Sequence, residues 1–99
     1  MTIYEHRTSL TVSGGSVSST TLRIIGGLCR QIIIRANTST TVFRADLGDA
    51  NGIIRRNYDF HQGELNDMDI ALPMVGVWTL NITNVSPDDT FRVVFGIQE

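Results

Sequence analysis

The residues that most often carry chemistry are few and scattered in this chain. Nucleophilic catalysis needs a Ser or Cys, a His base and a group that orients the base. The histidines are His6 and His61, the cysteine is Cys29, and no Gly-x-Ser-x-Gly segment is present. Cys29 lies among apolar residues with no His near it in sequence, which indicates a structural thiol. We therefore predict no catalytic residues, and we do not expect an enzyme.

The sequence also lacks a complete set of metal ligands at suitable spacing. One Cys and two distant His do not supply a zinc site. Asp46, Asp49, Asn51 and Gly52 resemble part of a calcium loop, but Leu47 stands where the first ligand belongs and no bidentate Glu follows. The segment therefore favours an ordinary hairpin turn closed by Asn-Gly. We predict neither a metal nor a cofactor.

Five residues are predicted to bind a protein partner. Tyr4, His6 and Arg7 are of types favoured at protein interfaces, and they follow one another near the N-terminus. Arg55 and Arg56 are adjacent, so in a strand they point to opposite faces, and at least one should meet solvent or a partner's carboxylate. Every basic residue of the chain is Arg. This suits interfaces, where Lys is depleted, although a codon bias would explain it equally well.

Composition limits the fold and the partners. The 99 residues are 41% hydrophobic and 18% charged, enough for one core, so we predict a single domain over 1–99. Ile, Val and Thr dominate, which favours an all-β fold. A net charge of −2 argues against nucleic acid as a partner, and no apolar run is long enough to cross a membrane. The first ten residues lack a signal-peptide pattern, so we expect folding in the cytoplasm without secretion.

Alternation of apolar and polar residues predicts about eight short strands. They cover residues 4–12, 20–25, 28–36, 41–47, 53–60, 68–72, 77–83 and 91–97. Gly26-Gly27 has the length and chemistry of a two-residue hairpin turn. Residues 61–67 form the most polar predicted loop, and Pro73 is expected to end the strand before it. Short strands without intervening helices predict a two-sheet antiparallel β-sandwich, jelly-roll-like in architecture.

The last third of the chain supplies the predicted core. Trp78, Leu80 and Ile82 alternate with polar residues in one strand, and the following strand does the same. The side chains expected between the sheets are Trp78, Leu80, Ile82, Phe91, Val93, Phe95, Ile32 and Ile34. In strand 28–36, simple alternation places Cys29 on the face opposite Ile32. An exposed Trp78 would instead be a platform for a sugar.

The segment Gly76-Val77-Trp78-Thr79-Leu80-Asn81-Ile82-Thr83-Asn84, closed by Asp88-Asp89-Thr90-Phe91, resembles the end of the jelly-roll P-domains of proprotein convertases and of related bacterial C-terminal domains. In size, class and lack of Lys the chain also resembles the small cement, or decoration, proteins of tailed-phage capsids. The first resemblance implies a fold. The second implies a virion structural protein that binds the major capsid protein or other virion subunits and forms a homo-oligomer. The alternative is a carbohydrate-binding or host-recognition module, for which we expect a concave aromatic groove.

Overall fold

The computed structural model describes residues 3–12 and 18–98, and they form an all-β fold. Its seven strands are β1 (Ile3–Val12), β2 (Ser18–Ala36), β3 (Val42–Gly48), β4 (Ile54–Gln62), β5 (Glu64–Asp67), β6 (Leu72–Ser86) and β7 (Asp89–Gln98). All pairings between them are antiparallel. None of the described residues forms a helix that is able to span a membrane.

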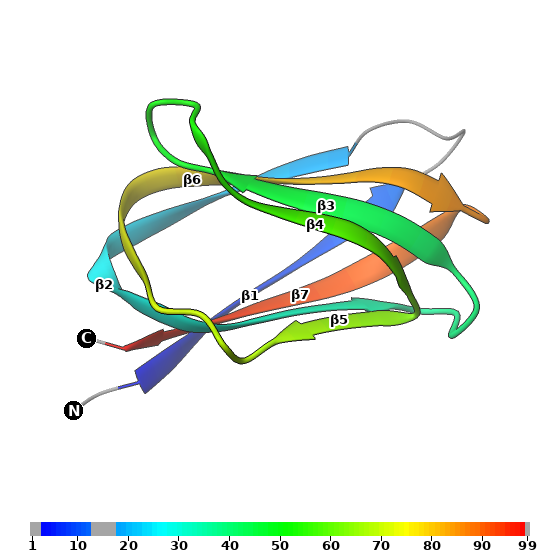
Figure 1. Cartoon of the computed structure of the whole chain (residues 1–99), viewed down its shortest axis with the longest axis horizontal. Coiled ribbons are helices and arrows are strands. Elements are labelled where there is room, and N and C mark those ends of the chain that lie inside the picture. Colours follow the sequence, from blue (N-terminus) through cyan, green and yellow to red (C-terminus); the bar gives the residue numbers. More distant parts are fainter. Residues whose placement is uncertain (1–2, 13–17, 99) are drawn as a thin grey trace.

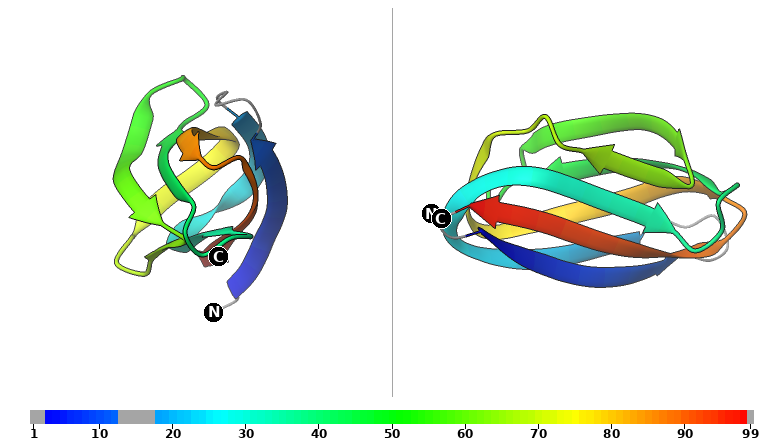
Figure 2. Two further views of the ribbon diagram at one scale, coloured as in Figure 1. Left: turned by 90° about the vertical axis from the view of Figure 1, so that its right-hand side faces the viewer. Right: turned by 90° about the horizontal axis from the view of Figure 1, so that it is seen from below.

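The strands form one continuous sheet that folds over into two layers (Figure 1). In one layer the second half of β2 lies between β5 and β7, and β1 flanks β7. In the other layer β6 lies between the first half of β2 and β3, and β4 flanks β3. Figure 2 shows the two layers from the side and from below. The predicted sandwich-like, all-β fold is confirmed.

The predicted hairpin at Gly26-Gly27 is wrong, because β2 runs through this pair as one strand of 19 residues. Both halves of β2 pair with β6, and the register shifts between Ile24 and Gly27. The two glycines therefore mark the corner at which β2 passes from one layer to the other. A bulge with glycine bends a strand sharply, so the same sequence signal fits a corner as well as a turn. This accounts for seven strands where about eight were expected.

The segment 61–72 also differs from its prediction. Its first part is not a loop, since β4 continues to Gln62 and β5 pairs with β2. Leu65 is the reason, because it faces the core opposite Ile34 while its polar neighbours face solvent. Residues 68–71 are not a strand, and Pro73 lies inside β6 opposite Leu28. The missing N–H of Pro73 is tolerated because β6 has only β2 beside it there; β3 pairs from Thr79 onward.

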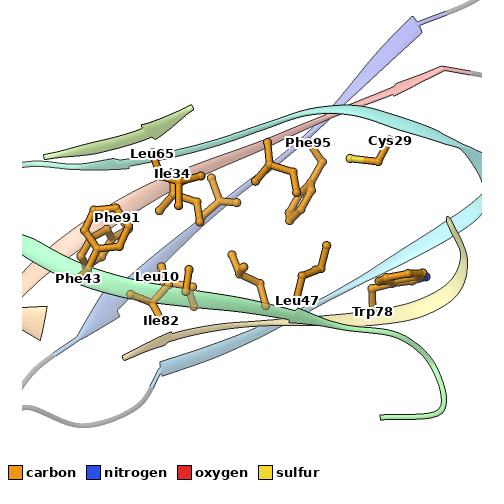
Figure 3. Close-up of a cluster of buried hydrophobic side chains, with 14 of the residues drawn as sticks. Leu10, Cys29, Ile34, Phe43, Leu47, Leu65, Trp78, Ile82, Phe91 and Phe95 are labelled. Atoms are coloured by element: carbon orange, nitrogen blue, oxygen red, sulfur yellow. The ribbon is translucent and has the colours of Figure 1, made fainter. Parts of the chain in front are cut away.

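The core lies between the layers and contains the predicted residues (Figure 3). Trp78 is 4% exposed, and the other seven predicted core side chains are fully buried. The rings of Phe43 and Phe91, one from each layer, meet edge to face with centroids 4.9 Å apart. Burial of large apolar side chains from both layers is the main force holding the layers together. The prediction of an inward-facing Trp78 is confirmed.

Candidate protein-binding surface

A tight turn between β3 and β4 builds one side of the candidate surface. The Asp49 Oδ1 atom accepts hydrogen bonds from the backbone N–H groups of Asn51 (2.9 Å) and Ile53 (3.0 Å). Gly52 takes a positive φ of 79°, as expected for the Asn-Gly pair. The Oδ2 atom of Asp49 accepts from Arg55 Nε at 2.8 Å. The turn is thus held from within, and it fixes the Arg55 side chain.

The electrostatics of this turn follow from the same contacts. The hydrogen bond from Ile53 and then that from Arg55 lower the pKa of Asp49 below its ordinary value. Asp49 therefore stays a carboxylate at neutral pH, with its oxygens directed at its own turn. Asp46, the other carboxylate of the calcium-like pattern, accepts a hydrogen bond from Asn81 Nδ2 at 2.8 Å. Both carboxylates are thus used within the fold.

A hollow of about 450 Å³ lies between this turn and the bend of β6. Its lining residues are Asp49, Ala50, Asn51, Arg55, Leu72, Pro73, Val75 and Trp78. Gly76 permits the bend because it takes a positive φ of 89°, and its Cβ position would be in ordinary van der Waals contact with the Ala50 methyl at 3.5 Å. Trp78 ends the row of core side chains at this side of the molecule (Figure 3) and donates its indole N–H to the Val75 carbonyl at 3.1 Å. The hollow therefore has an apolar, rigid floor.

Val75 lines the hollow, and three further exposed apolar side chains lie on the two segments that form it. Ile53 and Ile54 lie on the turn and at the start of β4, and Val75 and Val77 lie on β6. Val75 is the most exposed of the four, at 66%. We call the hollow and these four side chains the corner surface. Protein interfaces have a core depleted in charged residues and are enriched in Arg, and the corner surface joins exposed aliphatic side chains to one oriented Arg.

The five predicted partner-binding residues fall into two separate groups. Arg55 lines the hollow, while Arg56 lies opposite Leu47 and donates from Nη1 to the Arg55 carbonyl at 2.9 Å. The other three residues lie on β1, at the edge of the opposite layer. The structure therefore does not bring the two groups together.

The β1 residues differ in exposure. Tyr4 is half-buried against the core, and His6 is half-buried on the same face. Arg7 is exposed on the other face and forms an ion pair with Glu5. Among these three residues, only Arg7 is exposed enough to meet a partner freely, while Tyr4 packs against the core and His6 is partly buried.

Sequence reasoning missed the apolar members of the corner surface. Val75 and Val77 are out of phase with Trp78 and Leu80, so they occupy the solvent face of β6. Two valines at outward positions of a strand predict an exposed apolar patch. The contribution of Leu72 and Pro73 to the hollow could not be predicted, because it depends on the bend of β6.

A second, polar hollow of about 280 Å³ lies on the outer face of the β3–β4 layer. Its lining residues are Arg44, Ala45, Asp46, Asn57, Asp59 and Thr83. The guanidinium of Arg44 pairs with Asp59 at 3.0 Å and lies 4.9 Å from the centre of the Phe60 ring. Phe60 is 55% exposed. An exposed ring beside amide and carboxylate groups has the chemistry of a small sugar site.

Tyr58, His61 and Asp67 line a shallow hollow beside β4 and β5, and Cys29 is near enough to interact electrostatically with Tyr58 and Asp67. Burial raises the pKa of the Cys29 thiol, whose Sγ donates to the Gln31 carbonyl at 3.6 Å. Burial and then a hydrogen bond to Asp67 (2.7 Å) raise the pKa of Tyr58. Within residues 3–12 and 18–98, no three His, Cys, Asp or Glu side chains gather as metal ligands would.

We also compared the sequence with known protein families and with curated proteins. No protein-family model matches the sequence, and no curated protein is significantly similar to it.

Proposed function

We propose that this protein is a non-enzymatic structural protein that binds virion subunits, as a capsid cement protein does, through its corner surface. The observation that carries the proposal is the apolar hollow beside Trp78, with its exposed rim and its fixed arginine. The partner is the major capsid protein or a neighbouring virion subunit. The place of action is the virion, after synthesis in the host cytoplasm.

The corner surface has the properties that docking to a rigid partner needs. Its floor is pinned by the core, and its turn is held by three hydrogen bonds to Asp49. Little conformational entropy is therefore lost when a partner covers it. Burying Val75 and its apolar neighbours provides the driving force for binding. Arg55 forms a directional ion pair with a carboxylate of the partner.

Co-sedimentation with virus particles that lack the protein tests this proposal. The wild-type chain should bind saturably, and Val75→Asp should weaken binding about tenfold or more, because a charge enters the apolar centre. Phe60→Asp is the matched control, since Phe60 is similarly exposed but lies outside the corner surface. Equal binding of the wild type and Val75→Asp, with both folded, would contradict the proposed surface. Failure of the wild type to bind would contradict the function.

The second candidate is a carbohydrate-binding or host-recognition module, and Phe60 is the observation in its favour. Together with the polar hollow it offers a stacking face and several hydrogen-bonding groups. A glycan-binding screen separates the two functions. Glycan binding that is abolished by Phe60→Ala and unaffected by Val75→Asp, with no binding to particles, would favour the second function.

A further inference from the structure

Among the described strands, β1 has the longest outer edge with an unbroken register. The register with β7 is unbroken from Ile3 opposite Gln98 to Val12 opposite Asp89. In the described part of the chain, no strand pairs with the other side of β1. Figure 2 shows β1 at the margin of its layer. An edge like this presents a row of backbone donors and acceptors, to which another strand is able to pair.

The other edges are protected or poor in charge. β4 is interrupted twice, since its register with β3 shifts between Phe43 and Ala45 and again between Leu47 and Gly48. Such bulges twist an edge away from incoming strands. β5 is only four residues long. The free edge of the first half of β2, Ser18 to Ile24, carries Arg23 as its one charge.

The charges of β1 are arranged so that the strand complements itself. Glu5 and Arg7 both lie on its exposed face, where they form an ion pair within one chain. When two copies of β1 pair about a twofold axis, each residue has a fixed opposite, and side chains opposite each other share a face. A pair centred on His6 places Glu5 of each copy opposite Arg7 of the other.

Neighbouring registers lose this match. Centring the pair on Glu5 or on Arg7 places like charges directly opposite each other, which is destabilising. Centring it on Thr8 places Arg7 opposite Ser9 and leaves no opposite charges in register. Only the pair centred on His6 gives two complementary cross-strand ion pairs at once.

We propose that two copies of this chain associate through β1, antiparallel and centred on His6. The layer β5–β2–β7–β1 then continues across the twofold axis into the same strands of the second copy. Backbone hydrogen bonds supply the attraction, and the Glu5 and Arg7 pairs set the register. The proposal gives a geometry to the expected homo-oligomer, and it is independent of the corner surface.

Charge exchange tests the proposal on the purified full-length chain, with mass measured by light scattering and native mass spectrometry. The wild type should have the mass of a dimer. Glu5→Arg and Arg7→Glu each replace two attractive pairs by two repulsive ones, so each should raise the dimer Kd about tenfold or more. The double variant Glu5→Arg/Arg7→Glu restores opposite charges and should dimerise like the wild type.

A mixture of the two single variants gives the sharpest readout. Glu5→Arg carries two positive charges on β1 and Arg7→Glu two negative ones, so the mixture should form a heterodimer that neither variant forms as a homodimer. A role confined to the ion pair within one chain predicts no heterodimer. Arg35→Glu is the control, because Arg35 forms a similarly exposed ion pair with Glu64 away from β1; its mass should equal that of the wild type.

Three results would overturn the proposal. They are a wild type that is monomeric at every concentration tested, single variants that dimerise as tightly as the wild type, and a mixture that stays monomeric while each variant melts like the wild type. Each of these results concerns β1 alone and leaves particle binding through the corner surface to its own assay.

Discussion

The carboxylate of Asp89 holds the start of β7 in place through three hydrogen bonds. Its Oδ2 atom accepts hydrogen bonds from the Thr38 N–H and the Thr41 hydroxyl, both at 2.8 Å, and Oδ1 accepts from the Thr90 N–H at 2.8 Å. Thr41 is fully buried, so its hydroxyl depends on a partner inside the protein. Asp89 therefore joins the β2–β3 turn to the start of β7.

Replacing this carboxylate should destabilise the protein in a pH-dependent way. Burial raises the pKa of Asp89, but the hydrogen bonds from Thr38, Thr41 and Thr90 outweigh it, so the pKa lies below its ordinary value. The stabilisation is therefore complete above the unfolded-state pKa of about 4 and is lost as the pH falls through the folded-state pKa. At pH 7, Asp89→Asn should lower the free energy of unfolding by about 1–3 kcal/mol, because an amide N–H₂ replaces an acceptor.

Urea unfolding of the wild type and Asp89→Asn between pH 7 and pH 2.5 measures this effect. The difference between the two proteins should shrink as the pH falls. Asp69→Asn, at an exposed position in the segment before β6, serves as the control and should follow the wild type. A difference that stays constant over this range would show that the charge of Asp89 contributes nothing.

Trp78 joins the core to the corner surface, so its loss should be felt in both. Trp78→Ala should lower the free energy of unfolding by about 3–5 kcal/mol, as truncation of a large buried aromatic does. Val77→Ala, at the adjacent outward position, should change it by less than about 1 kcal/mol. Denaturant titration followed by circular dichroism measures both. A small effect of Trp78→Ala would mean that the indole is not part of the core.

At the scale of elements, the two corner strands β2 and β6 decide the architecture. β2 pairs in both layers, and β6 follows it around the corner, since Leu72 to Met74 still pair with β2 from Gly27 onward. At the β2 corner Gly27 lies against β7: a Cβ there would stand 2.6 Å from Ile97 Cγ2 and 2.9 Å from the Gln98 carbonyl oxygen. Gly26 next to it has no atom within 4 Å of its Cβ position. Of the two glycines, only Gly27 is required by close packing.

This contrast gives a matched pair of variants. Gly27→Ala should lower the free energy of unfolding by about 1–3 kcal/mol, because the added methyl forces β7 away from the corner. Gly26→Ala should change it by no more than about 0.5 kcal/mol. Thermal and urea unfolding of both variants measure the difference. Equal effects would contradict a close approach of β2 and β7 at Gly27.

The elements also show what the sequence can and cannot predict. The alternation around Trp78 and Phe91 predicts both strands and their buried faces, because a strand with one buried face has a period of two. Cys29 breaks this rule: it is buried on the same face as Ile32, since the register with β7 shifts between Cys29 and Gln31. A bulge adds one residue and so reverses the inward and outward alternation of the side chains that follow. No residue type in this segment predicts a bulge. The corner at Gly26-Gly27 is not predictable from the sequence either, because glycine is equally compatible with a hairpin turn and with a sharp bend in a strand.

The candidate surface was predictable only in part. Arg55 is identified by residue type and Val75 by its outward phase on β6. That the two line one hollow depends on the bend at Gly76 and on the turn at Asp49, which lie more than 20 positions apart in the sequence. Long-range packing brings the two segments together, and a local sequence pattern does not predict this proximity. The same holds for Phe60, whose exposure follows from its place at a bulge of β4.

At the scale of the whole molecule, a two-layered scaffold presents two separate surfaces. The corner surface lies between the β3–β4 turn and the bend of β6, and the free edge of β1 lies in the other layer. Under the two proposals one surface holds a virion subunit and the other holds a second copy of the chain. In that arrangement one dimer presents two corner surfaces, and simultaneous binding of both raises the overall affinity above that of either contact alone.

The thermal stability of virus particles that lack this protein tests the central claim most directly. Particles are heated with and without the purified chain, and release of their nucleic acid is followed with an intercalating dye. The wild-type chain should raise the release temperature, and Val75→Asp, although folded, should not. An unchanged release temperature at saturating wild-type protein would contradict the claim that this domain is a capsid cement protein.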